Sequence, residues 1–99
     1  MKIEFPKKPT PQIIKDLSGV LDKRAFPQTI SLSHESNELV VKISKMGTST
    51  LIFTRTDAKK RAEFSLTSEN IAFAHKPFYG QFKDELLSVV EEAGGKVTE

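Results

Sequence analysis

A run of basic side chains is the feature of this sequence with the clearest chemical meaning. Arg55 precedes a predicted hairpin tip that carries Lys59, Lys60 and Arg61. Clustered Lys and Arg side chains bind phosphate groups through charge and counterion release, so this tip predicts binding of nucleic acid or another anion. The same pattern is typical of a solvated turn, and the residues alone leave both interpretations open.

The side chains that usually carry catalysis or bind metals form no recognisable pattern. His34 and His75 are far apart, and neither has a second ligand at metal-binding spacing on its own strand. The chain has no Cys, no strand–turn–helix elbow of the G-x-S-x-G kind and no glycine-rich phosphate loop. We therefore predict no catalytic residue, no metal site and no cofactor, and a non-enzymatic protein rather than an enzyme.

The length and composition indicate one small globular domain. The 99 residues are 37% hydrophobic and 28% charged, with a net charge of +2. These values favour a folded chain, and the charge is too balanced to indicate nucleic-acid binding by itself. No apolar run has the length of a signal peptide or a membrane span. We predict a single soluble, cytoplasmic domain over residues 1–99, without a membrane contact.

Two segments have the apolar period of a helix. The first begins at Thr10-Pro11, has its apolar stripe in residues 13–21 and is stopped by Pro27. The second has its stripe in residues 78–93 and ends at Gly94-Gly95. Outside them, we predict that residues 1–9, with two prolines, form an extended N-terminal arm, and that residues 95–99 form a short flexible tail.

Between the helices the apolar period changes to two, which is typical of half-buried strands. Short polar turns at residues 35–38, 45–48, 57–60 and 67–70 join these strands, so antiparallel neighbours are expected. The apolar positions that alternate are Ile30, Leu32, Leu39, Val41, Ile43, Leu51, Phe53, Phe64, Leu66, Ile71 and Phe73. We predict an α+β two-layer sandwich in the order α-β-β-β-β-β-α, a meander of four to five antiparallel strands with both helices on one face.

This fold leaves the other face of the sheet open, and that face supports the leading functional prediction. It is rich in Ser and Thr, with Val40 and Ile52 as apolar exceptions and Lys42 beside them. We predict a protein-interaction module that binds an unknown protein partner through this face or through an edge strand, where a second copy could also pair. The alternatives are the basic tip as an anion or nucleic-acid site, and a small-ligand pocket between helices and sheet near residues 75–79.

The order helix, meander, helix resembles the frataxin family in topology alone. That family carries an acidic ridge on its first helix and sheet edge for iron. The first predicted helix here has Asp16 and Asp22, which are balanced by Lys15, Lys23 and Arg24. The resemblance therefore implies no iron site in this chain, and no family follows from it.

Overall fold

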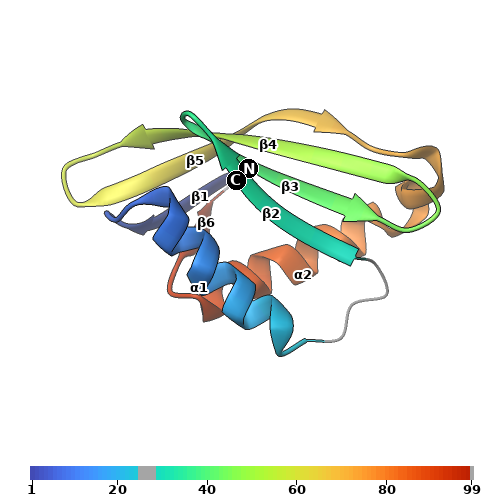
Figure 1. The fold of residues 1–99 in the computed structure, drawn as a ribbon, viewed down its shortest axis with the longest axis horizontal. Helices are drawn as coiled ribbons and strands as arrows, with labels where there is room; N and C mark the ends of the chain where they lie inside the picture. The colour runs from blue at the N-terminus through green and yellow to red at the C-terminus, as the bar shows by residue number, and fades with distance from the viewer. Residues whose placement is uncertain (25–28, 99) are drawn as a thin grey trace.

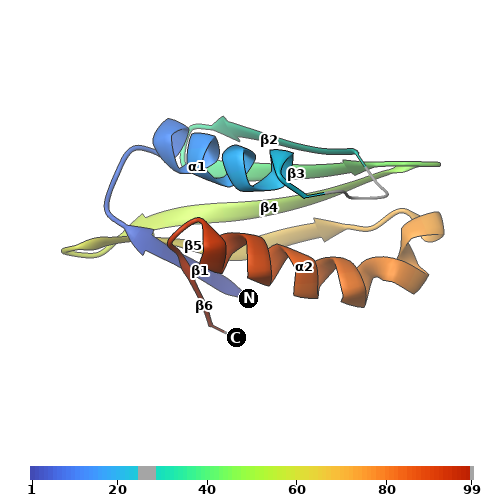
Figure 2. The ribbon, with the colours of Figure 1, turned by 90° about the horizontal axis from the view of Figure 1, so that it is seen from below.

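The computed structural model describes residues 1–24 and 29–98. Within these residues six strands form one antiparallel sheet, and two α-helices cover one of its faces (Figures 1 and 2). The predicted α+β class is confirmed. In chain order the elements are β1 Lys2–Pro6, α1 Thr10–Asp22, β2 Thr29–Glu35, β3 Glu38–Ser44, β4 Thr48–Asp57, β5 Arg61–Asn70, the 3₁₀ helix η1 Phe73–Phe78, α2 Tyr79–Glu92 and β6 Lys96–Thr98.

The sheet combines a meander with two strands from the ends of the chain. Strands β2 to β5 are neighbours in chain order, as predicted, and the full order is β2-β3-β4-β5-β1-β6. Strand β1 therefore lies inside the sheet, between β5 and β6. The edges are β2 and β6, so one edge is the predicted first strand of the meander and the other comes from the C-terminal segment.

Residues 1–9 were predicted to form an extended arm, but part of this segment is the inner strand β1. Ile3 pairs with Phe64, and Ile3 and Phe5 are buried in the core. Their alternation with polar neighbours is a strand period. Pro6 stands at the end of the strand, where its missing N–H interrupts no ladder. The prolines that suggest an arm thus mark only where β1 ends.

The C-terminal segment 95–99, predicted as a flexible tail, contains strand β6. It pairs with β1 through Glu4 and Lys96, and through Lys2 and Thr98. Three residues carry too short an alternation to be recognised in the sequence.

The fifth predicted strand, around Ile71 and Phe73, does not form. Strand β5 continues through the predicted turn at 67–70 to Asn70, and η1 follows. Pro77, inside η1, could not donate to a sheet ladder. The element order is therefore β-α-β-β-β-β-α-β, with six strands instead of four to five.

Large apolar side chains fill the space between the sheet and the two helices. The rings of Phe5 and Phe64 pack edge to face, with centroids 6.3 Å apart. Phe53 beside them is fully buried. The buried side chains of the two predicted apolar stripes face this core, with Ile13, Leu17 and Val20 from α1 and Phe82, Leu86, Val89 and Val90 from α2. Phe78, predicted as the first residue of the second stripe, is instead exposed, because it ends η1 before α2 begins.

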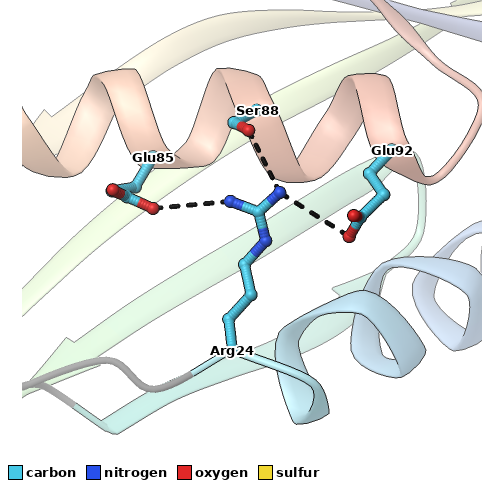
Figure 3. A network of polar contacts seen from close by, with 4 residues as sticks. All are labelled: Arg24, Glu85, Ser88 and Glu92. Carbon is cyan, nitrogen blue, oxygen red and sulfur yellow. Dashed lines mark hydrogen bonds and ion pairs between the residues drawn. The ribbon is translucent and has the colours of Figure 1, made fainter.

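A polar contact joins the end of α1 to α2 (Figure 3). The Arg24 guanidinium donates to Ser88 Oγ at 3.0 Å and lies 3.5 Å from Glu85 Oε2 and 3.6 Å from Glu92 Oε2. Pro27, the predicted stop of the first helix, lies outside the described residues. Neither described helix combines the length and the apolar content that a membrane span requires.

Candidate functional site

The open face of the sheet carries the first group of predicted binding residues. Val40 on β3 lies opposite Ile52 on β4. Both point away from the helices, because the residues on either side of each in the sequence are buried in the core. Ser33 and Ser68 flank them in the same row, and Lys42 is exposed further along β3. The structure thus brings Val40, Ile52 and Lys42 together as a small, half-buried apolar patch beside one cation.

The predicted basic tip lies at one end of the sheet, on the left in Figure 1. Lys59 and Lys60 lie in the β4–β5 turn and Arg61 begins β5. Two lysines from other segments join them. Lys7 donates its backbone N–H to the Lys60 carbonyl at 3.1 Å, and Lys96 begins β6 beside β1. We call these five exposed residues the basic end. Lys7 and Lys96 were missed from sequence, because only the unpredicted strands β1 and β6 bring them here.

Arg55 does not belong to the basic end. It lies opposite Phe64 on the helix side of the sheet, with its guanidinium 5.8 Å from the centroid of that ring. It donates to Thr10 Oγ1 and to Asp57 Oδ1, both at 2.8 Å. Thr10 is the first residue of α1, so Arg55 fastens the start of that helix to the sheet. Strand alternation separates Arg55 from the cations that follow it in the sequence.

Exposed apolar side chains gather at the opposite end of the sheet. Met46 and Phe73 are each 87% exposed, and Phe78 is 53% exposed. Met46 lies in the β3–β4 turn, while Phe73 and Phe78 begin and end η1. The two segments touch, since a Cβ built on Gly47 would lie 3.2 Å from Ala72 Cβ. We call Met46, Phe73 and Phe78 the apolar end. Phe73, predicted to face the core, is exposed because the fifth strand does not form.

A hydrogen-bond network holds these two segments together. Ser49 Oγ accepts from the Ala72 N–H at 2.8 Å and lies 2.6 Å from His75 Nδ1. His75 Nε2 lies 2.6 Å from the carbonyl oxygen of Lys45. A carbonyl only accepts, so we assign the imidazole proton to Nε2, and the Ser49 hydroxyl then donates to Nδ1. Ser49 is fully buried and His75 is 7% exposed, so the contact between their side chains is buried, while the bonds to Ala72 and Lys45 are partly buried.

This serine–histidine pair has the distance of a catalytic dyad but not its surroundings. A nucleophile has to reach a substrate, whereas Ser49 is buried and hydrogen-bonded on both sides. The second nitrogen of His75 faces a backbone carbonyl instead of an orienting carboxylate. The pair therefore has a structural role. In residues 1–24 and 29–98 no three His, Asp or Glu side chains lie together as a metal site would need.

An entirely apolar cavity between the helices and the sheet, with Leu17, Phe53 and Leu86 in its lining, has a volume of about 10 Å³, room for about one water molecule. None of residues 75–79 lines this cavity, so the small-ligand pocket predicted near them stays a prediction. Near the predicted pocket, the Tyr79 hydroxyl donates to Glu69 Oε2 at 2.6 Å. Burial, and then this bond, raise the pKa of Tyr79 well above its ordinary value. Lys83 Nζ lies 5.3 Å from the centroid of the same ring. Tyr79 is thus engaged by its own chain.

Edge strand β2 lacks the residues that would block pairing with a further strand, as the prediction of strand addition requires. Its interior has neither Lys nor Pro, the residues that usually block pairing with another chain. Pairing of two copies through this edge stays a prediction.

Comparisons of the chain with models of protein families, with curated proteins and with solved structures give no match.

Proposed function

We propose that this protein is a protein-interaction module that captures a partner protein through its apolar end. The observation that carries the proposal is the exposure of Met46 and Phe73, each at 87%, on two segments that are held together by hydrogen bonds. A single exposed apolar side chain needs no explanation. Here three of them lie on two linked segments at one end of the sheet, and we infer that a partner covers them.

The backbone at Met46 supports this proposal. Its φ is +55°, in the left-handed region, which costs a non-glycine residue about 1–2 kcal/mol. Asn or Gly would suit this turn better and would expose no apolar surface. Met46 is therefore unfavourable in this turn, both for its backbone conformation and for its exposed apolar surface. Its flexible thioether can adapt to the surface of a partner, and binding would explain why Met occupies this position.

The Ser49–His75 network also favours binding. Association costs less when the contacting segments are already fixed, because less conformational entropy is lost. Aromatic side chains that insert into a partner's pocket often dominate the affinity of an interface. Phe73 is an exposed aromatic side chain on a fixed segment. It begins η1, which is hydrogen-bonded to the sheet through Ala72 and His75.

Charges around the apolar end indicate the chemistry of the partner. Lys76 Nζ lies 6.0 Å from the centroid of the Phe73 ring, and Lys45 precedes Met46. Within the described ranges neither lysine has a carboxylate at ion-pair distance. The partner surface that fits is an apolar pocket with acidic residues on its rim.

Site-specific crosslinking tests the proposal. A photoreactive p-benzoylphenylalanine replaces Phe73 in one sample and Lys42, on the open face, in a second, in cells that express the protein natively. We expect one discrete protein adduct from position 73, with the crosslinked peptide at an apolar pocket rimmed by Asp or Glu. Lys45→Glu with Lys76→Glu should weaken this adduct strongly. An adduct from position 42 alone, or one that joins two copies of this chain, would contradict the proposal.

Met46→Asn gives a second test that a purely structural role would not pass. The substitution should raise the free energy of unfolding by about 1 kcal/mol, because Asn tolerates the left-handed region. It should also reduce the crosslinked yield from position 73. A variant that is more stable and binds equally well would remove Met46 from the contact surface.

A further inference from the structure

The basic end is a second surface, unrelated to the apolar end, and its cations come from three separate connections. They are the β1–α1 loop with Lys7, the β4–β5 turn with Lys59 and Lys60, and the α2–β6 connection that leads to Lys96. Figures 1 and 2 show these connections at the same end of the sheet. Convergence of charges from three connections makes a surface where the sequence shows only a three-residue run.

Most of these cations have no ion-pair partner within the described part of the chain. Among the described residues no carboxylate lies at ion-pair distance from Lys7, Lys59, Lys60 or Lys96. Arg61 is partly engaged, because its guanidinium lies 3.9 Å from Glu4 Oε2 and 3.5 Å from Glu63 Oε1. The argument therefore depends on the four lysines.

The nearby acidic groups are largely neutralised by other basic residues. Lys2 Nζ lies 3.1 Å from Glu63 Oε2, and this contact lowers the pKa of Glu63. Lys8 Nζ lies 2.6 Å from Asp16 Oδ2, and its hydrogen bond lowers the pKa of Asp16. These carboxylates already have cations of their own and do not compensate the four lysines.

The surface is also hollowed. A shallow depression of about 260 Å³ is bordered by Lys60, Arg61 and Lys96, with Gly94 and Glu4 in its lining. A second depression of about 370 Å³ shares Lys60 and Arg61 with the first and adds Lys59. Gly94 contributes no side chain, so a ligand can approach the backbone there. Among the described residues, Glu4 is the carboxylate in the lining of these depressions, and the Arg61 guanidinium lies 3.9 Å from its Oε2.

We propose that the basic end binds the sugar-phosphate backbone of nucleic acid without reading its bases. A regular row of phosphates gains affinity from counterion release alone, and lysines are suitable point-charge ligands for it. Within the described chain the exposed large apolar side chains all lie at the other end, so none is available here for base stacking. An acidic peptide would lack an apolar anchor at this surface, and a lipid bilayer would find nothing to insert.

Salt-dependent binding of labelled oligonucleotides to the full chain tests this proposal. With about four phosphate contacts, the slope of log K against log salt for a single-stranded 20-mer is about −2.8. The affinity should then fall about fifty-fold between 50 and 200 mM NaCl. Oligo-dT and a mixed sequence should bind within about three-fold of each other, because bases are not contacted.

The combined variant Lys59→Gln, Lys60→Gln, Lys96→Gln should reduce the slope to about −0.7. A matched variant, Lys23→Gln, Lys42→Gln, Lys83→Gln, removes the same charge elsewhere and should keep the wild-type slope. Equal slopes for the two variants, or no binding at 20 mM NaCl, would overturn the proposal. So would binding of poly-glutamate or of phosphatidylserine vesicles that is as tight as binding of the oligonucleotide.

Discussion

The buried Ser49–His75 network makes the sharpest prediction about this fold. Ser49→Ala removes one oxygen atom and leaves two groups without their partner, the buried His75 Nδ1 and the partly buried Ala72 N–H. Each unsatisfied buried group costs about 1–3 kcal/mol, so we expect a loss of about 3 kcal/mol in the free energy of unfolding. This is a large part of the ~5–15 kcal/mol that stabilises a typical domain. It should lower the melting temperature by roughly 12–24 °C.

Urea unfolding followed by circular dichroism measures this loss. The midpoint should fall while the m-value is unchanged, because the surface exposed on unfolding stays the same. Ser65→Ala is the matched control. Ser65 is half-exposed on β5 and forms none of the side-chain hydrogen bonds found in the described residues. Ser65→Ala should therefore change the free energy of unfolding by no more than about 0.5 kcal/mol.

Hydrogen exchange at Ala72 tests the same contact locally. Its N–H donates to Ser49 Oγ and should exchange slowly in the wild type and much faster in Ser49→Ala. If Ser49→Ala and Ser65→Ala have equal midpoints and Ala72 exchanges at the wild-type rate, the network does not hold η1 on the sheet. The argument for a fixed apolar end would then be refuted.

Three further predictions test contacts elsewhere in the fold. Arg55→Ala should lower the free energy of unfolding measured in urea by about 1.5–3 kcal/mol. It should leave the salt slope of oligonucleotide binding unchanged, and a less steep slope would show that Arg55 contributes to the basic end. Gly95→Ala should lower the free energy of unfolding by about 1–3 kcal/mol, because the new Cβ would lie 2.7 Å from a core phenylalanine ring. Gly19→Ala, with nothing within 4 Å of the new Cβ, should instead raise it by about 1 kcal/mol. Equal effects of the two substitutions would contradict this packing. Tyr79 has its pKa raised by burial and then by Glu69, so its stabilising contribution is complete below about pH 10 and is lost at higher pH; Tyr79→Phe should flatten this alkaline loss in thermal melts, and an unchanged pH profile would refute it.

Local patterns were enough to predict the centre of this fold. The alternation of Leu39, Val41 and Ile43 identified β3, and all three side chains are buried on the helix side of the sheet. Each such pattern lies within one element and needs no knowledge of its neighbours. For the same reason the two helices and the meander β2–β5 followed from the sequence.

Contacts between distant segments decided the parts that could not be predicted. Ile71 and Phe73 alternate like a strand, yet a hydrogen bond between Ser49 and His75, 26 residues apart, fixes that segment as η1 instead. Similarly, Phe5 looked like part of an arm because its role depends on pairing of β1 with β5. The exposure of Phe73 and the position of Lys96 both follow from these long-range contacts, so most of the two surfaces lay beyond a local pattern.

The two proposed surfaces should behave independently, and this can be tested in one set of variants. They lie at opposite ends of a molecule whose longest dimension is 40 Å, while charges in 0.1 M salt are screened within about 10 Å. Neutralising Lys59, Lys60 and Lys96 should therefore leave the crosslinked adduct from position 73 at its wild-type yield. Conversely, Met46→Asn should leave the salt slope of oligonucleotide binding unchanged. If each variant abolished both activities, the losses would reflect a shared change in the folded state, and neither surface could be assigned from them.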